Sequence, residues 1–255
     1  CMSRFCGEHG GYLTTDDFAE FNVGIEEPQT GTYKGYDLYT CSTWCQGPAF
    51  IQTLHLLEGV DLSSMKHGSA EYTHTVIEAI KLAFADRHAY YGDPDFVDVP
   101  IDELLSEKYL AKRRSLIDPG LAWPGTPPAG DPRSGRSTLD GEPQSPSEAV
   151  VPVGTAGVSG GGTSYFAVID REGNIFSSTP SEGTKNGGPI IPGTGLAFSL
   201  RGSQSKLIHG HPASVEPGKR PRLTPAPALV MRDGEPVLAL GAHGGEHIPQ
   251  VNFQL

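Results

Sequence analysis

The chain has 255 residues, a formal net charge of −11 at pH 7, 33 glycines, 22 prolines and four cysteines. The acidic balance argues against a nucleic-acid-binding protein, which typically carries a basic patch, and no apolar run is long enough to span a membrane. The glycine and proline content predicts long loops, and four cysteines are too few for a disulfide scaffold at this length.

The two ends of the chain predict a fragment of a longer protein. The opening CMSRFCGEHGG has no apolar stretch typical of a signal peptide, and it resembles the last turns of a helix. The final PQVNFQL stops within an apolar run without a turn or cap. The sequence therefore does not predict the cellular compartment.

The first half of the sequence predicts helices and one hairpin. Thr14 is expected to cap a short helix, and residues 32–40 alternate around Gly35 as a hairpin does. Gln46-Gly47-Pro48 is expected to open a helix that ends at Gly59, because proline suits the first helical turn and glycine the end.

Two further helices are predicted downstream. Ser69 is expected to cap a helix that runs to Tyr90, and residues 102–117 have the pattern of another amphipathic helix. The apolar stripe of the longer helix is expected to consist of Val76, Ile77, Ile80, Ala83 and Phe84.

The pattern changes after the third helix. Residues 118–162 are dominated by Pro, Gly, Ser and Thr and predict a flexible surface segment. From Thr163 onward, apolar and polar residues alternate with a period of two. This pattern predicts strands at residues 165–169, 175–179, 195–200, 228–231 and 236–241. Helices followed by strands indicate an α+β domain.

Three local motifs suggest chemistry, and for each of them a simpler interpretation is the stronger one. Gly157–Gly161 matches G-x-S-x-G, the nucleophile turn of α/β-hydrolases, which requires a strand before it and a helix after it. Here a Gly- and Ser-rich segment precedes it and a predicted strand hairpin follows, so a chance match is the better interpretation. His243–His247 matches H-x-x-E-H, yet its two glycines cost about 2 kcal/mol of helix propensity relative to alanine. A glycine turn with two free backbone N–H donors, suited to an oxyanion hole, is the better interpretation. Cys41 and Cys45 form a C-x3-C pair that is weak evidence for a redox or metal site.

Thr163 is the candidate nucleophile, because three glycines precede it and a strand follows. An alcohol needs a base to remove its proton, and an N-terminal α-amine with a pKa of roughly 7.7–8.0 can serve. The peptide bond between Gly162 and Thr163 must then be cut. Attack by the Thr163 hydroxyl on the Gly162 carbonyl would cut it, and glycine permits the distorted backbone that such an attack requires. An ordinary glycine-rich loop entering a strand is the alternative.

Six ordered segments of the sequence resemble the γ-glutamyltransferase (glutathione hydrolase) family of N-terminal-nucleophile hydrolases. They are GGYLTTDDFAEF, CQGPAFIQTLHLLEG, HTVIEAIKLAFADRHAYYGDP, GTSYFAVIDREGN, and the pair PGKRPRLTPAPALV and GAHGGEHIPQ. The resemblance implies a four-layer αββα sandwich. It also implies that residues 1–162 are the end of a large subunit, with a processing linker at 118–162, and that residues 163–255 begin a small subunit, the two forming one structural domain.

The resemblance assigns roles to individual positions. Thr163 corresponds to the nucleophile that self-cleavage after Gly162 exposes, Ser181 to a hydroxyl residue that supports it, and Gly244 and Gly245 to the oxyanion-hole pair. Thr224 corresponds to the second of two serines that hold the donor carboxylate, and Arg201 lies in the segment that binds the donor amino group.

Besides Ser164 and Tyr165, which replace a threonine and a histidine of the family pattern, three donor-site positions depart from it. Leu223 replaces the first substrate serine, Gly183 replaces an asparagine of the donor site, and the segment SLRGSQ around Arg201 lacks an aspartate. These changes remove polar partners for a zwitterionic glutamyl group, and an ammonium without a carboxylate is costly to bury. They indicate a divergent bacterial-type branch.

The sequence therefore predicts an autoprocessing γ-glutamyl transferase or hydrolase that works through an acyl-enzyme, with water or an amine as acceptor. On this interpretation the enzyme needs neither a cofactor nor a metal ion. The alternatives are an acylase with a non-glutamyl donor, as in the β-lactam acylases, and a non-catalytic binding homologue that does not cut itself. A metal protein using Cys41, Cys45, His243 and His247 is a third, weaker alternative.

Overall fold

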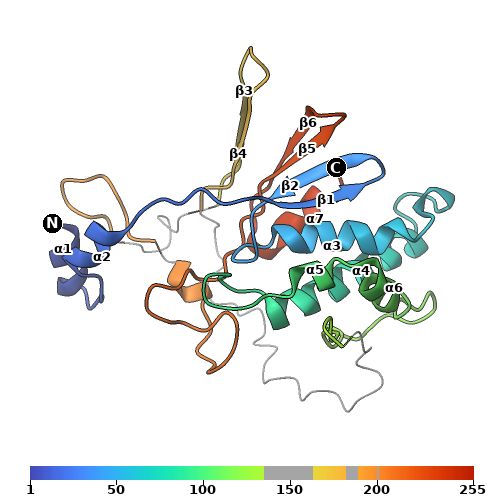
Figure 1. Ribbon diagram of the computed structural model, residues 1–255, viewed down its shortest axis with the longest axis horizontal. Coiled ribbons are helices and arrows are strands. Elements are labelled where there is room, and N and C mark those ends of the chain that lie inside the picture. The colour runs from blue at the N-terminus through green and yellow to red at the C-terminus, as the bar shows by residue number, and fades with distance from the viewer. Residues whose placement is uncertain (135–162, 182–188, 200) are drawn as a thin grey trace.

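The computed structural model describes residues 1–134, 163–181, 189–199 and 201–255 (Figure 1). A four-stranded antiparallel sheet with the strand order β1-β2-β5-β6 lies at its centre. A separate antiparallel hairpin, β3-β4, projects away from this sheet. The strands are β1 (Gln29–Tyr33), β2 (Tyr36–Thr40), β3 (Phe166–Ile169), β4 (Ile175–Ser178), β5 (Ala228–Arg232) and β6 (Glu235–Leu240).

Helices cover one face of the four-stranded sheet, while α1 and α2 lie apart from it beside the N-terminus (Figure 1). None of the helices in the described ranges is both long and apolar enough to cross a membrane. The helices are α1 (Met2–Glu8), α2 (Thr15–Glu20), α3 (Gly47–Glu58), α4 (Ala70–Tyr90), α5 (Ile101–Leu104), α6 (Glu107–Arg114) and α7 (Ile248–Asn252), with short 3₁₀ turns η1 (Leu62–Ser64), η4 (Arg201–Gln204) and η5 (Gly245–His247).

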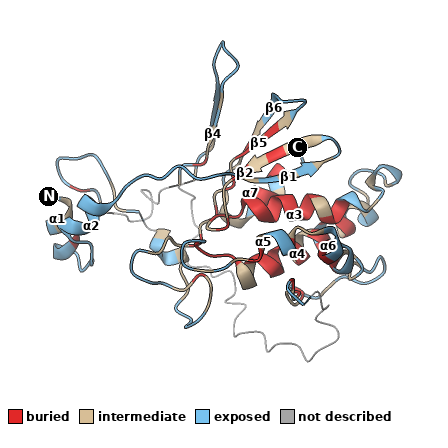
Figure 2. Ribbon diagram, in the orientation of Figure 1, coloured by how far each residue is buried: buried red, intermediate tan, exposed pale blue. Residues whose placement is uncertain are grey.

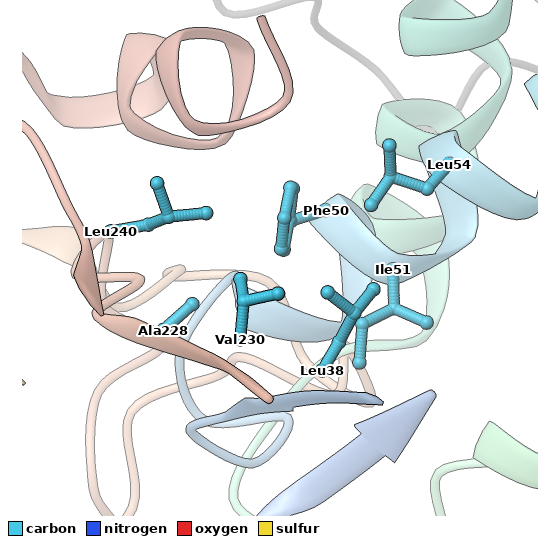
Figure 3. Close-up of a cluster of buried hydrophobic side chains, with 7 residues drawn as sticks. All are labelled: Leu38, Phe50, Ile51, Leu54, Ala228, Val230 and Leu240. Carbon is cyan, nitrogen blue, oxygen red and sulfur yellow. The ribbon is translucent and has the colours of Figure 1, made fainter. Parts of the chain in front are cut away.

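The main core lies between the sheet and α3 (Figure 3). Ala228 pairs with Leu240 across β5 and β6, and Leu38 pairs with Val230 across β2 and β5. Opposite residues of an antiparallel pair point to the same face, so these four side chains form one apolar surface. The α3 side chains that cover it are Phe50, Ile51 and Leu54.

Helix α3 is buried on both sides, as Figure 2 shows. Its other face carries Leu56 and Leu57, which pack against Ala79 and Leu82 of α4. A helix enclosed between a sheet and a second helix must be apolar nearly all round. Helix α3 is therefore the central element that fixes the position of the sheet relative to α4.

Several predicted element ends are confirmed. Thr14 caps α2 in a capping box: its hydroxyl accepts from Asp17 N at 3.3 Å and its N–H donates to Asp17 Oδ2 at 2.6 Å. The Ser69 hydroxyl accepts from Tyr72 N at 3.2 Å at the start of α4. Gly35, with a φ of +83°, lies in the turn between β1 and β2.

Other predictions about the helices and strands were wrong. Ile77 is 44 % exposed, because the buried side of α4 is centred on Ala79, Leu82 and Ala83 instead. The helix expected over 102–117 is two helices, because α5 ends at Leu104 and Ser106 caps α6 by accepting from Tyr109 N. Within the described part of 195–200 there is a single bridge from Ala197 to Ile190 and no strand.

The start of the expected flexible segment is also ordered against the helices. Trp123 N donates to Glu78 Oε2 at 3.2 Å, and Gly130 N donates to Asp86 Oδ1 at 3.0 Å, so both acceptors lie on α4. The carbonyl of Pro128 accepts from Arg113 Nη1 at 2.9 Å. Two buried carboxylates and a buried guanidinium thus hold residues 118–134 in place, which residue composition alone could not indicate.

A buried ion pair connects α4 to α6, and its loss is expected to destabilise the fold. Arg113 Nη2 lies 3.1 Å from Asp86 Oδ1, and both side chains are fully enclosed. Burial raises the pKa of Asp86, whereas the Arg113 guanidinium opposes that rise. We expect Asp86→Asn to lower the free energy of unfolding by about 3–5 kcal/mol, because Arg113 stays buried without its counter-charge.

Chemical denaturation measures this effect. Asp233→Asn, at an exposed turn with a φ of +53°, is the matched control, because asparagine tolerates the same backbone conformation. The control is expected to change stability by about 0.5 kcal/mol or less. Equal stability of the two variants would contradict the prediction.

Candidate active site

The base of the β3-β4 hairpin brings two hydroxyl groups together. Thr163 and Ser181 form an antiparallel bridge, and Thr163 Oγ1 lies 2.5 Å from Ser181 Oγ. The neighbouring Ser164 N donates to Pro180 O at 2.9 Å. Backbone pairing therefore fixes a hydroxyl–hydroxyl hydrogen bond between residues that are 18 positions apart in the chain.

Arg201 holds Ser181 from the other side. Its Nε donates to the Ser181 carbonyl at 2.9 Å, and its Nη2 donates to Ser181 Oγ. A guanidinium has donors only, so one lone pair of the Ser181 hydroxyl is committed to Arg201. The expected substrate-binding residue Arg201 thus directly orients the partner of Thr163 and places a positive charge beside this pair.

Gly244 and Gly245 form a turn at the end of the central sheet. Their φ values of +115° and +62° lie in the region that favours glycine. Neither N–H donates a hydrogen bond to another residue within the described ranges. The segment is thus a turn that leads into η5, with two adjacent N–H groups that a ligand oxygen can accept from, as an oxyanion hole requires.

The zinc-like spacing at His243–His247 lies in this turn rather than on an α-helix. Cys41 and Cys45 are both free thiols. In the part of the chain that the structure describes, no group of three or more Cys, His, Asp or Glu side chains is arranged to hold a metal ion.

The hairpin base lies close to the strand that leads into the glycine turn. Tyr165 OH lies 3.1 Å from Ser177 Oγ, which in turn donates to the Leu240 carbonyl at 3.2 Å. The Tyr165 ring also covers Gly241 so closely that an added Cβ there would lie 2.1 Å from ring atom Cδ2. Tyr165, two residues after Thr163, therefore packs against Gly241 at the end of β6. Gly241 lies three residues before Gly244.

Gln46 connects the glycine turn to Thr224. Its Nε2 donates to the Gly245 carbonyl at 2.7 Å and also to the Thr224 carbonyl, and Gln46 is fully buried. Thr224 itself is 9 % exposed. The sequence predicted Gln46 only as a helix start. A polar residue directly before Gly47-Pro48 was the only local signal for a special role of Gln46. Its hydrogen-bond partners lie about 180–200 positions further along the chain, so the sequence could not identify them.

The structure thus brings together Thr163, Ser181 and Arg201 in one group, and Gly244, Gly245 and Thr224 in another. Gly162, the expected partner in self-cleavage, lies outside the described residues, as do the G-x-S-x-G segment and Gly183.

Comparison with known proteins identifies the family. The γ-glutamyltranspeptidase family profile matches residues 2–255. The chain belongs to this family. Its members are N-terminal-nucleophile hydrolases, and the α+β fold class expected from the sequence is confirmed by the mixed helices and sheet described above.

Relatives in this family include both glutathione hydrolases and acylases. The chain is 33 % identical to the glutathione hydrolase-like YwrD proenzyme of Bacillus subtilis, over 95 % of this chain and 41 % of that protein. It is 30 % identical to the acylase ACY 1 proenzyme of Pseudomonas sp. strain SE83, over 97 % of this chain and 40 % of that protein.

Solved structures show the same relationship. The crystal structure of cephalosporin acylase from Bacillus halodurans matches with a TM-score of 0.81 and 29 % identity, over 99 % of this chain and 41 % of that one. The chain therefore spans about two fifths of the length of the family relatives it matches.

Proposed function

We propose that this chain belongs to an autoprocessing amidase or acyltransferase in which Thr163, once it is an N-terminal residue, is the nucleophile. Residues 1–162 are then the end of the large subunit and residues 163–255 the start of the small one. The observation that carries the proposal is the 2.5 Å contact between Thr163 Oγ1 and Ser181 Oγ, with Arg201 bound to the same hydroxyl.

Processing and turnover use the same hydroxyl in this proposal. During processing, Thr163 Oγ1 attacks the Gly162 carbonyl carbon, the C–N bond breaks, and an ester and a free α-amine form. Water hydrolyses the ester and releases the Gly162 carboxylate. The new α-amine is the base that the hydroxyl lacked before cleavage.

In turnover the α-amine removes the hydroxyl proton while Oγ1 attacks the substrate amide carbonyl. The tetrahedral oxyanion accepts hydrogen bonds from the N–H groups of Gly244 and Gly245. The C–N bond then breaks, the amine departs with the proton, and the acyl group stays on Thr163. Water hydrolyses this ester, or an amine takes the acyl group.

The acyl group itself is either γ-glutamyl or a related group without the α-ammonium. Glutathione hydrolases among the relatives support the first, and acylases support the second. The position of Arg201 favours the second, because its guanidinium places a positive charge next to Ser181 and Thr163. An α-ammonium held in this region would be repelled, and no carboxylate side chain hydrogen-bonds to Ser181 or Arg201 among the described residues.

The test is the mass and N-terminal sequence of the purified full-length protein, combined with a panel of chromogenic amides. We expect two pieces, the smaller beginning TSYFAVID, and release of the amine from at least one amide. γ-Glutamyl anilide and its analogue without the amino group, glutaryl anilide, separate the two donor classes. An intact chain that turns over none of the amides would favour the non-catalytic binding homologue.

Ser181 and Arg201 are expected to affect turnover more than substrate binding. Ser181→Ala removes the hydrogen-bond partner of the nucleophile, and Arg201→Met removes the group that orients Ser181. We expect a decrease in kcat of about 10- to 100-fold for each variant with little change in KM, since a charge-assisted hydrogen bond contributes about 1.5–3 kcal/mol.

Steady-state kinetics on fully processed protein measures this split. Additivity of the two substitutions would contradict the proposal, because residues that act through one hydrogen-bond chain are expected to be non-additive. Arg232→Met, at the exposed end of β5, removes a positive charge elsewhere and is the control.

A further inference from the structure

Gln46 occupies the position directly before α3, where a polar side chain usually caps a helix, but its side chain makes no cap hydrogen bond. A capping side chain accepts from the N–H groups of the first helical turn. The Gln46 amide instead donates through Nε2 to the carbonyls of Gly245 and Thr224, so both of its hydrogens are used. The side chain therefore holds two segments that are distant in sequence, and does not stabilise the start of its own helix.

The segment around Thr224 lies against the loop that leads into α3. Leu223 N donates to the Trp44 carbonyl at 2.7 Å, and Gln46 N donates to the Pro225 carbonyl at 3.3 Å. The Gln46 side chain binds the carbonyl of the residue between these two, and Gln46 is fully buried. Three successive residues are thus bonded to the start of α3, which fixes the position of Thr224 relative to that helix.

The glycine turn has bonds of its own that give it shape. His247 N donates to the Gly244 carbonyl at 3.1 Å, and Ile248 N donates to the Gly245 carbonyl. These bonds lie within the turn, so they do not determine where the turn sits relative to other segments. Two glycines without Cβ atoms also leave the backbone wide conformational freedom. The bond from Gln46 Nε2 to the Gly245 carbonyl, at 2.7 Å, ties this turn to α3.

Helix α4 holds the same two segments through their side chains. Arg87 Nη1 donates to Glu246 Oε1 at 2.8 Å, and the next residue, His88, accepts at Nδ1 from Arg222 Nη1 at 3.2 Å. Glu246 directly follows the glycine turn, and Arg222 lies two residues before Thr224. Gln46 differs from this arrangement because a single amide binds both backbones directly.

We propose that Gln46 is a positioning residue for the oxyanion-hole turn. On the proposed amide chemistry, on which this inference rests, the N–H groups of Gly244 and Gly245 must meet the carbonyl oxygen of the amide that Thr163 attacks. By binding the Gly245 and Thr224 carbonyls with one amide, Gln46 fixes the turn and the Thr224 segment in one arrangement. A displacement of about 1 Å in such groups lowers a rate by about 100-fold. Gln46 acts through these carbonyls and needs no contact of its own with the substrate.

Kinetics on the full-length, processed protein tests this role. We expect Gln46→Met to lower kcat by about 10- to 100-fold and to change KM by less than about threefold, because the displaced N–H groups act mainly in the transition state. The substrate is γ-glutamyl anilide or glutaryl anilide, whichever the protein turns over faster. Gln52→Met is the matched control: Gln52 is a fully buried amide of the same helix whose Nε2 donates to Asp86 Oδ2 at 2.7 Å. Its kcat is expected to stay within about twofold of the wild type.

Gln46→Glu supplies a pH-dependent readout and serves if Gln46→Met does not fold. An ionised carboxylate can only accept and is repelled by both carbonyls, whereas the protonated carboxyl can donate to one of them. Burial favours the protonated form. The kcat of Gln46→Glu relative to the wild type is therefore expected to rise at least about threefold from about pH 8 to about pH 6. The relative kcat of Gln46→Met is expected to stay constant, since methionine does not titrate.

Hydrogen exchange tests the positioning without a substrate. We expect the backbone N–H groups of Leu223 and His247 to exchange at least about tenfold faster in Gln46→Met than in the wild type or in Gln52→Met. Circular dichroism checks that each variant is folded.

The outcomes separate this inference from the proposed function. Equal kcat values for Gln46→Met and Gln52→Met, the same pH dependence for Gln46→Met and Gln46→Glu, or unchanged exchange would overturn the role of Gln46 and leave the amidase proposal intact. Faster exchange in Gln46→Met, in a protein whose wild type turns over no amide, would support the hold of Gln46 on the turn and count against the proposed function.

Discussion

Thr163→Ala is expected to abolish both self-cleavage and amide turnover. The substitution removes Oγ1, the atom that forms the new bond in each reaction, and the 2.5 Å contact with Ser181 Oγ is lost with it. Because the remaining groups can only bind and polarise the amide, we expect turnover to fall by at least about 10⁴-fold. The protein should keep the mass of the uncut chain.

Two neighbouring substitutions make this result specific. Thr163→Ser keeps a hydroxyl at the same place and should restore cleavage and some turnover. Ser164→Ala removes an exposed hydroxyl one residue away, whose backbone N–H still bonds to Pro180 O. Mass spectrometry and a chromogenic amide assay measure both properties. Cleavage of the Thr163→Ala chain, or turnover similar to that of Ser164→Ala, would refute the assignment of the nucleophile.

The sequence predicts the elements whose signals are local. The caps at Thr14 and Ser69 act within three residues, and the alternation of β2 and β5 follows from one buried face. The candidate nucleophile also carries a local signal, since glycines precede Thr163 and a strand follows it. The resemblance to a known family added the positions of Ser181, Gly244 and Gly245.

The errors have physical causes that lie outside the local pattern. The apolar stripe on α4 was misplaced at Ile77, because the enclosed side of that helix also carries Glu78, Asp86 and Arg87. These charged residues are buried by pairing with distant groups, such as Arg113 for Asp86 and Glu246 for Arg87. Hydrophobic periodicity assigns charged residues to the surface and so cannot find such pairs.

The connections within the candidate site are also long-range. Gln46 bonds to carbonyls 178 and 199 positions further along the chain, and Arg222 meets His88 across 134 positions. Spacing in a single sequence contains no information on contacts of this kind. Arg201 is an example: the resemblance placed it in a donor-binding segment, but no pattern in the sequence indicated that its guanidinium donates to Ser181.

Gly244→Ala is expected to lower kcat strongly while it lowers the free energy of unfolding only slightly. At a φ of +115°, an alanine would force the backbone to rotate and would turn the N–H groups of the glycine turn away from a shared acceptor. The added Cβ itself has room, since its nearest neighbour is His247 Cβ at 3.5 Å. The loss of one oxyanion donor typically lowers kcat by about 10²–10³-fold.

A second glycine provides the control for backbone strain. Gly234 has a φ of +82° in the turn between β5 and β6, and an added Cβ there meets nothing within 4 Å. Gly234→Ala should therefore destabilise the protein by about 1–2 kcal/mol, as Gly244→Ala does, without lowering kcat. Thermal denaturation and steady-state kinetics on processed protein compare the two. If both variants lose activity equally, strain in the fold explains the loss, and the turn at Gly244 and Gly245 has no part in stabilising the oxyanion.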